Sequence, residues 1–501
     1  SVEMSSLTRN STSECRANST DTKGDDGMGQ TGYWIISVAK FAQSTWETVS
    51  RIARALGISE DKILYNGMKD ARAFTSQELS LPASLVTEEA VRRLKIRKVR
   101  ICGVKWSPSP CKLGSHFGNR FSITLRGAKC TAREGLEESH EWRADLKSIM
   151  HKWKDSGFVN YFGPQRFTNA RLEEAGKHYL RRNYSQILST LLSLSAKSPK
   201  LRSQFDQNLA LDVVNRLATG MSAREVLGEQ RDYEAIRLFV ARLEDVVKRK
   251  RKHTEEVYVG NSEQECRDNG SIDRDVAEAM CRKAWLRVPV RMRILALTAY
   301  QSKVWNIVAS ERIRCYGLHP IDGDLIGKPD GNDGERKKKG ATGEVTWYNQ
   351  SAETSWRSPG YSRDWCWRGV TIFDVVLPLP GAGMKLPKHA VGNLLQCYLE
   401  TDGTMGKWKV EGRGRRTFLR TVNYRPVVSR PINVCWTATP ILPEGKKPRS
   451  GSGDWHVPAS SPNDNAEPTN PELKVRITFS LRAGEFATMA LRDITAVRRQ
   501  R

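Results

Sequence analysis

The sequence predicts a protein that mixes strands with helices, and two patterns of apolar residues support this prediction. Apolar segments typical of strands run from Tyr33 to Ala39, from Phe121 to Leu125 and from Val475 to Leu481, the last two alternating with polar residues. Between them, apolar residues recur at helical spacing from about 172 to 252 and from about 291 to 314. The chain has 501 residues, more than one hydrophobic core usually organises, so we expect at least two domains.

The first elements lead to a turn that carries charged residues. Residues 1 to 31 are rich in Ser, Thr, Asn, Asp and Gly, which predicts a flexible N-terminal arm. The strand from Tyr33 to Ala39 is followed by an amphipathic helix, and a short strand from Ile63 to Tyr65 then runs into an Asn-Gly turn. Lys69 and Asp70 are therefore expected on a loop at a strand end, where rigid scaffolds commonly present reactive groups.

Changes in composition divide the rest of the chain. We expect one domain over 32 to 315, with a helical and basic insertion at about 172 to 274. Residues 316 to 436 are polar and Gly-rich with a fresh apolar patch, which indicates an inserted domain. The last part, 437 to 501, is expected to return to the first domain through a flexible loop at 441 to 470 and to end in a strand and a short helix.

Positive charge dominates the composition. The 81 Lys and Arg residues outnumber 56 Asp and Glu, which gives a formal net charge of +25 and a pI near 9.7. Such an excess indicates a polyanionic partner, either RNA, DNA or an anionic membrane, although a merely soluble basic protein is an alternative. Four basic clusters would grip phosphate or lie in solvated loops: Arg92 to Arg100, Lys248 to Lys252, Arg336 to Lys339 and Arg413 to Arg416.

Several classes of protein are disfavoured. Apolar runs stay far below the ~20 residues of a membrane span, so we expect a soluble protein without membrane contact. The ten cysteines form no CxxC pair and the eight histidines no HExxH or HxE…CxxC pattern, so we expect thiols in a reducing, intracellular compartment and no metal. Phosphate-binding motifs such as GxxxxGK[ST] are absent from the sequence, so no nucleotide cofactor is expected. A mitochondrial or nuclear location is a guess from the basic composition.

Seven segments carry the pattern most informative about function. The first is YNGMKDARAFTSQELSL, which contains Lys69 and Asp70. The others follow along the chain as LGSHFGNRFSITLRG, GFVNYFGPQRF, AYQSKVWNIVASERI, IDGDLIG, LPLPGAG and FSLRAGEFATMALRDI. In this order they resemble the motifs of the TruD family of RNA pseudouridine synthases, and the resemblance extends over most of the chain.

The resemblance implies a fold and a reaction. The fold is α+β: a mixed, largely antiparallel pseudouridine synthase sheet with packed helices, plus an inserted TruD-specific α/β domain. The reaction is isomerisation of uridine to pseudouridine in RNA without metal or organic cofactor, with Asp70 as the catalytic carboxylate. An anionic group beside the ribose can attack C1' or remove the 2' proton, and the sequence leaves both routes open. Without the resemblance, Asp70 reads as a turn or helix-cap carboxylate.

Four further motif positions are implied to complete the active site. Lys69 would orient Asp70 or bind phosphate, or be an exposed surface lysine. Asn119 would position the catalytic carboxylate. Phe121 and Phe486 would contact the flipped target base, because stacking on an aromatic face offsets part of the cost of unstacking. The alternative for both rings is a plain place in the core.

The remaining matches concern RNA binding. Asn160, Gln165 and Arg166 belong to the block NYFGPQRF, which would bind the substrate backbone or brace the floor of the active site. Lys40 aligns with a family Lys-x-Asn-x-x-Thr segment, in which Ala42 replaces the Asn and leaves the role of Lys40 open. The family's usual N-terminal strand is not visible, and SVEM at the start of the chain could be its remnant.

Two functions follow as hypotheses. The first is an active pseudouridine synthase acting on structured RNA, with tRNA the leading substrate by family analogy and rRNA an alternative. The second is an RNA-binding scaffold or ribosome and ribonucleoprotein assembly factor that retains the synthase fold. The complete set of Asp70, Asn119 and Phe121 favours the enzyme, because a retired pocket has no physical need for a carboxylate.

Overall fold

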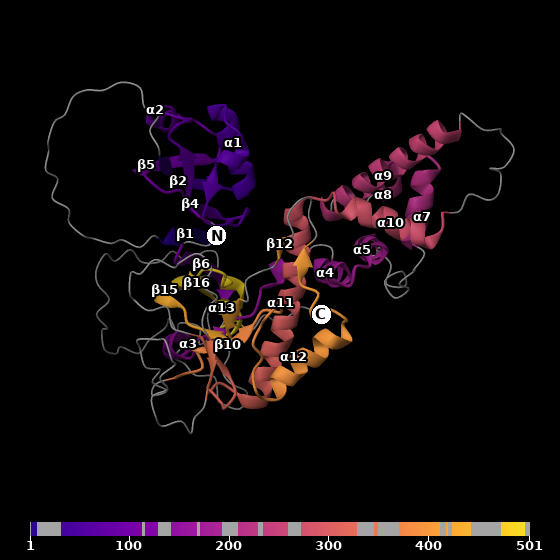
Figure 1. Ribbon diagram of the computed structural model, residues 1–501. Helices are drawn as coiled ribbons and strands as arrows, with labels where there is room; N and C mark the ends of the chain where they lie inside the picture. The colour runs from indigo at the N-terminus through magenta and orange to yellow at the C-terminus, as the bar shows by residue number, and fades with distance from the viewer. Residues whose placement is uncertain are drawn as a thin grey trace, which may run out of the picture. The chain divides into compact units, whose positions relative to one another are not determined.

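The structure is a computed structural model in two compact units. It describes residues 2–7, 32–112, 116–128, 142–167, 171–192, 209–228, 234–258, 272–327, 345–348, 370–410, 417–418, 423–441 and 472–495. The first unit comprises 1–158 together with 430–501, and the second comprises 159–429 (Figure 1). These limits differ from the ranges suggested by composition, and the assignment of 316 to 436 to a separate insertion stays a prediction.

A twisted sheet organises the first unit. Within the described residues it has eight strands in the order β15-β16-β6-β1-β4-β2-β5, with β3 paired to β4. All the pairings are antiparallel except that of β1 with β4, so the expected mixed, largely antiparallel sheet is confirmed. The strands are β1 Val2–Leu7, β2 Tyr33–Phe41, β3 Leu64–Tyr65, β4 Phe74–Pro82, β5 Val99–Ser107, β6 Gly118–Ala128, β15 Ile432–Pro440 and β16 Leu473–Arg482.

The first residues of the chain occupy the middle of this sheet. Val2–Leu7, which composition assigned to a flexible arm, forms β1 between β4 and β6. Met4 is the register partner of Thr75 on one side and of Phe121 on the other. The SVEM segment therefore supplies a strand, while the rest of the expected arm, 8 to 31, lies outside the described residues.

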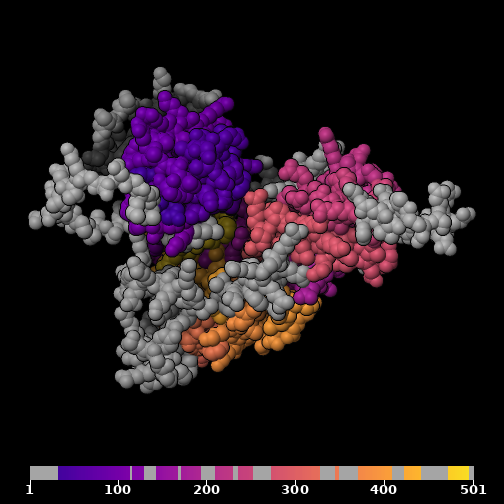
Figure 2. All heavy atoms as spheres, turned by 45° about the horizontal axis from the view of Figure 1, so that its top comes forward, coloured from indigo at the N-terminus to yellow at the C-terminus, as the bar shows by residue number. Residues whose placement is uncertain are grey.

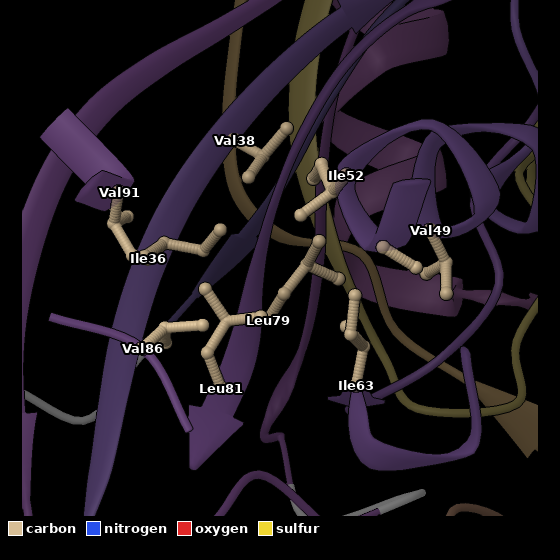
Figure 3. Packing of buried hydrophobic residues seen from close by; sticks show 10 residues of the cluster. Ile36, Val38, Val49, Ile52, Ile63, Leu79, Leu81, Val86 and Val91 are labelled. Carbon is tan, nitrogen blue, oxygen red and sulfur yellow. The ribbon is translucent and has the colours of Figure 1, made fainter. Parts of the chain in front are cut away.

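One half of the sheet packs against helix α1. This helix, Thr45–Leu56, begins where Ser44 accepts a hydrogen bond from the amide of Glu47 and ends at Gly57, whose φ of 68° suits glycine. Its inward face meets apolar side chains of β2 and β4 in a core shown in Figure 3, and the short helix α2, Glu88–Arg92, joins it. In Figure 2 the atoms of residues 32 to 112 form one closely packed body.

The other half of the sheet packs against α3, Trp142–Ser156, and α13, Ala487–Arg492. The Trp153 indole donates a hydrogen bond of 2.7 Å to the carbonyl of Ala490. Its ring meets Phe479 edge-on with centroids 5.2 Å apart, and Phe479 is the register partner of Phe121. The expected closing strand and short helix are β16 and α13, and they join this half of the unit.

The second unit is largely helical. Its helices are α4 Leu172–Arg181, α5 Tyr184–Leu192, α7 Leu209–Ala218, α8 Ala223–Leu227, α9 Glu234–Tyr258, α10 Arg274–Trp285, α11 Val290–Tyr316 and α12 Ala390–Thr401. The long helix expected from 291 to 314 is α11. It packs so closely on α4 that a Cβ atom added at Gly176 would lie 2.2 Å from the carbonyl oxygen of Ala296.

A small sheet lies in the same unit. Within the described residues it has four strands in the order β13-β10-β8-β9: β8 Leu325–Gly327, β9 Val345–Trp347, β10 Val375–Pro378 and β13 Tyr424–Pro426. The buried guanidinium of Arg312 on α11 pairs with Asp324 just before β8, at 2.6 Å. The remaining short elements are η1 Glu60–Lys62, β7 Phe158–Val159, η2 Pro164–Arg166, β11 Lys409–Val410, β12 Thr417–Phe418 and β14 Val428–Ser429.

Several expected features fall outside the described residues. These are the loop at 442 to 470 and the basic clusters Arg336 to Lys339 and Arg413 to Arg416. The cluster Lys248 to Lys252 lies on α9, and the cluster Arg92 to Arg100 joins the end of α2 to the start of β5.

Candidate active site

The loop between β3 and β4 presents Asp70 at the surface of the first unit. The Asp70 side chain is exposed, and its Oδ1 accepts a hydrogen bond of 2.8 Å from the amide of Arg72. This local bond fixes one carboxylate oxygen by the same geometry that lets Asp cap turns. The loop therefore offers an oriented carboxylate to an approaching molecule, as the sequence predicts for a strand end.

A buried lysine from β2 holds this loop from below. Lys40 is 1% exposed, and its Nζ donates hydrogen bonds to the carbonyl oxygens of Asp70 at 3.0 Å and Gln43 at 2.6 Å. Burial lowers the pKa of Lys40, while the negative charges of Asp70 and Glu47 oppose that shift. Lys40, whose role the family alignment left open, therefore contacts the backbone of Asp70.

Lys69 links the loop to β6. Its side chain is buried, and Nζ donates a short hydrogen bond to Oδ1 of Asn119. Its amide donates to the Thr45 hydroxyl at 2.9 Å, and that hydroxyl donates to Gln77 Oε1 at 2.9 Å. The structure therefore brings Lys69, Asp70 and Asn119 together, with Asn119 bonded to the neighbour of Asp70.

Burial sets the electrostatics of this cluster. Desolvation lowers the pKa of Lys69 from 10.5 to about 8, and the nearby charge of Lys40 adds to that shift. The buried ammonium group of Lys40 also interacts electrostatically with Asp70, and its positive charge favours an anion at the loop. An exposed surface lysine, the alternative for Lys69, is excluded by its burial.

The two aromatic candidates occupy different surroundings. Phe121 on β6 is 6% exposed, and its ring stacks on Phe479 with centroids 5.5 Å apart and an interplanar angle of 25°. Phe486 precedes the first residue of α13 and is partly exposed. One face of the Phe121 ring is therefore covered by the core, while Phe486 keeps accessible surface.

His116 is a neighbour of the loop that the sequence analysis did not single out. A Cβ atom added at Gly67 would lie 3.3 Å from His116 Cε1, so the imidazole packs directly on the turn that precedes Asp70. Burial and the charge of Lys69 lower the pKa of His116, opposed by a hydrogen bond with the backbone of Asn66. The signal was present in the sequence, because His116 is the titratable residue that opens the HFGNRF part of its motif.

Asn160 braces the second unit. It is buried, its Nδ2 donates to the carbonyl of Pro426 at 3.2 Å, and its Oδ1 accepts from Arg425 Nη2 at 2.5 Å. The Arg425 guanidinium also lies 4.2 Å from the centroid of the Phe162 ring. These contacts join the NYFGPQRF block to β13.

Gln165 and Arg166 lie on η2 in the same unit. Gln165 is exposed, whereas Arg166 is half-buried and its Nε donates to the Ser302 hydroxyl at 3.3 Å. Burial lowers the pKa of Arg166. Within the NYFGPQRF block, Asn160 is therefore buried and braces the unit, whereas Gln165 and Arg166 are more accessible.

The described residues also bear on metal binding and on membrane insertion. Among these residues, no group of three or more His, Cys, Asp and Glu side chains is placed to hold a metal ion. In the same part of the chain, no helix is long and apolar enough to cross a membrane.

Comparisons with known proteins agree with the motifs. A putative pseudouridine synthase of Caenorhabditis elegans is 24% identical over 475 residues, covering 92% of this chain and 65% of the relative. The zebrafish (Danio rerio) pseudouridylate synthase PUS7L is 25% identical over 417 residues, covering 81% of this chain and 56% of the relative. A probable tRNA pseudouridine synthase D of Archaeoglobus fulgidus is 27% identical over 287 residues, covering 57% of each chain. This chain spans less than two thirds of the length of these relatives.

A solved structure shows the same fold. The putative tRNA pseudouridine synthase D of Methanosarcina mazei matches with a TM-score of 0.53 and 17% identity, covering 98% of this chain and 91% of that one. The model of the family tRNA pseudouridine synthase D (TruD) matches residues 13–494. Because that match includes nearly every residue, the resemblance is confirmed and this chain belongs to the TruD family of pseudouridine synthases.

Proposed function

We propose that this chain isomerises uridine to pseudouridine in structured RNA, with Asp70 as the catalytic carboxylate. The observation that supports this proposal best is the loop itself. An exposed carboxylate is held by an amide hydrogen bond from Arg72 and by Lys40 beneath its backbone. The names of two of the similar proteins include tRNA, which makes tRNA the first substrate to test.

The chemistry needs one anionic oxygen beside the ribose. Asp70 either attacks C1' as the C1'–N1 bond breaks, or removes the 2' proton to give a glycal-like intermediate. The freed uracil turns, and C5 bonds to C1' as the Asp70 ester bond breaks in the first route or as C2' regains its proton in the second. The proton then lost from C5 is balanced by one gained at N1. Substrate and product have the same composition, so the reaction needs neither oxidant nor co-substrate.

Other residues position the carboxylate and the base. Lys40 and the Lys69 to Asn119 hydrogen bond hold the loop so that Asp70 meets the sugar of an extruded uridine. Phe486, which is partly exposed, and the small accessible part of Phe121 would contact that base, since Phe121 is 6% exposed and Phe479 covers one side of its ring. Stacking on aromatic side chains contributes roughly 1 to 3 kcal/mol per base, which offsets part of the cost of flipping.

The second unit would bind the backbone of the RNA. Gln165 is exposed and Arg166 is partly so, and amide and guanidinium groups commonly donate to phosphate oxygens. We assign Asn160 the bracing role, because its polar atoms are used by Arg425 and by the carbonyl of Pro426. The scaffold hypothesis depends on the positive charge, the long insertions and the altered N-terminus, whereas the oriented carboxylate specifically favours an enzyme.

The experiment maps pseudouridine at base resolution in a pool of unmodified tRNA transcripts incubated with the purified chain. Wild type is compared with Asp70→Asn, which keeps an acceptor for the Arg72 amide while it removes the charge. Asp61→Ala, an exposed carboxylate elsewhere in the same unit, is the matched control. We expect pseudouridine with wild type and Asp61→Ala and none with Asp70→Asn, although RNA still binds. Equal maps for all three proteins would refute the proposal.

A further inference from the structure

Two phenylalanines lie side by side and exposed at the end of the catalytic loop. Phe41 closes β2, Phe74 opens β4, and the two residues are register partners in the antiparallel ladder. They are 55% and 47% exposed, respectively. Residues directly opposite each other on neighbouring strands have adjacent side chains, so the Phe41–Phe74 pair presents one continuous aromatic surface.

The pair projects away from the core of its own half of the sheet. The neighbours Lys40 and Thr75 are register partners too, and both are buried on the side that faces α1. Because successive side chains of a strand point to opposite faces, Phe41 and Phe74 point to the other face. Single exposed aromatics are ordinary, but two adjacent ones form an apolar patch that indicates a binding surface.

A basic turn adjoins this pair. The amide of Phe41 donates to the carbonyl of Lys98 at 3.2 Å, and Gln43 Nε2 donates to the carbonyl of Arg97 at 3.1 Å. Lys98 has a φ of 65°, so the chain reverses sharply here. The exposed cations of the turn are Lys95, Arg97, Lys98 and Arg100.

Aromatic rings beside several cations are the combination that binds unpaired nucleotides. Bases stack on the rings whatever their identity, while the cations follow the phosphates. A protein partner fits less well, because charged residues are depleted from the centres of protein interfaces. Charge complementarity therefore favours RNA as the occupant.

We propose that the Phe41–Phe74 pair stacks an unpaired base next to the target uridine, while the turn 95 to 100 binds the adjoining phosphates. Lys40 connects the two places, since it precedes Phe41 and its Nζ bonds to the carbonyl of Asp70. When the target uridine flips out of the base stack, one face of the adjoining base loses its stacking partner. The Phe41–Phe74 pair stacks on that face instead. The proposal rests on the proposed function for the identity of the RNA and for the place of the target uridine, but not for the binding of an unpaired base by this surface.

The first experiment measures binding. The probe is a single-stranded RNA 12-mer of mixed sequence with one 2-aminopurine, whose fluorescence falls when the base stacks. We expect Phe41→Ala/Phe74→Ala to weaken binding by about 5- to 100-fold and to abolish the quenching, as loss of one stacked base implies. Phe41→Tyr/Phe74→Tyr should restore both. Trp106→Ala is the matched control, because Trp106 is 51% exposed and pairs with Trp34 at the other end of β2.

The second experiment locates the contact. Unmodified tRNA transcripts containing 5-iodouridine are crosslinked to the wild-type chain, and the linked tryptic peptides are identified. We expect links in Phe41 to Arg51 and in Ala73 to Arg92. Arg97→Gln/Lys98→Gln should also reduce the salt dependence of binding to the 12-mer, by up to about 1.4 in the slope of log affinity against log salt.

The outcomes separate this proposal from the proposed function. If wild type makes no pseudouridine but the binding, quenching and crosslinks behave as expected, the aromatic surface stands and the enzyme hypothesis fails. If wild type is active while the double alanine variant binds and quenches like wild type, the surface assignment is overturned. A double variant that keeps its RNA affinity but changes the oligomeric state would show a protein interface instead, which also overturns it.

Discussion

Lys69 donates a hydrogen bond from its ammonium group to the side-chain oxygen of Asn119, which lies 50 residues further along the chain. The bond joins the loop that carries Asp70 to the strand that carries Phe121. The bond places Asn119 against Lys69, the neighbour of Asp70, so an effect of Asn119 on the carboxylate would pass through that residue. This relationship leads to the first two predictions.

Replacing Asn119 by Ala should lower kcat by about 10- to 100-fold, because a hydrogen bond to a charged group contributes roughly 1.5 to 3 kcal/mol. Single-turnover rates on tRNA transcripts measure the effect. Asn119→Asp, which keeps an acceptor for Lys69, should retain more activity than Asn119→Ala. Wild-type rates for the alanine variant would contradict a positioning role.

The stability of the first unit should depend on the protonation of Lys69. Its pKa is lowered from 10.5 to about 8 in the folded chain, so between these pH values the unfolded chain holds a proton that the folded chain has released. Stability contributed by Lys69 therefore rises with pH across this window, by up to about 3 kcal/mol. Denaturant unfolding of wild type and Lys69→Met at pH 7.5 and 10.5 measures the difference. If the difference in unfolding free energy between wild type and Lys69→Met is the same at both pH values, Lys69 keeps its ordinary pKa in the folded chain.

Gly176→Ala should strongly destabilise the second unit. The added Cβ would lie 2.2 Å from the carbonyl oxygen of Ala296, so α4 and α11 must separate. Overpacking of this kind typically costs about 1 to 3 kcal/mol, and more when backbone must move. Thermal unfolding measures the loss of stability. Gly406→Ala would be a poor control, because the φ of 73° at Gly406 is itself unfavourable for alanine. Ser310→Ala on the exposed face of α11 serves instead, and equal melting temperatures for both variants would refute the close approach.

Asn160 and Gln165 should behave differently although they lie in one motif. Asn160→Ala leaves the buried guanidinium of Arg425 without one of its acceptors, which should cost about 1 to 3 kcal/mol of unfolding free energy. Gln165→Ala changes an exposed side chain and should alter stability by under about 0.5 kcal/mol, while it weakens RNA binding if Gln165 contacts the backbone. Chemical denaturation and filter binding separate the two effects. If Asn160→Ala weakened RNA binding and Gln165→Ala destabilised the chain, the roles assigned to the two residues would have to be exchanged.

Sequence patterns predicted the long elements well. Strong periodicity located β2 and α11 to within two residues, because apolar spacing reflects burial directly. The pattern failed for β1, whose residues VEMSSL alternate weakly, and for β5, whose start lies in the basic cluster Arg92 to Arg100. In both strands the partners across the ladder, rather than the local composition, determine the structure.

The sequence indicated which residues lie together in the candidate site, but not which of them contact one another. The motifs identified Lys69, Asp70 and Asn119, and the strand-end position of the loop followed from the Asn-Gly turn. The bond from Lys40 to the Asp70 carbonyl joins residues 30 apart, and only the pairing of β2 with β4 brings them together. Burial of Phe121 against Phe479 likewise depends on β16, which follows from the tertiary fold and not from local spacing.

The pairing of β6 with β16 has a consequence for synthesis. Strand β6 ends at Ala128, whereas β16 begins only at Leu473. While a ribosome makes the intervening chain, the β6 edge waits without its final partner, and an open edge can pair with other molecules. We therefore expect the nascent protein to need a chaperone until β16 has been synthesised.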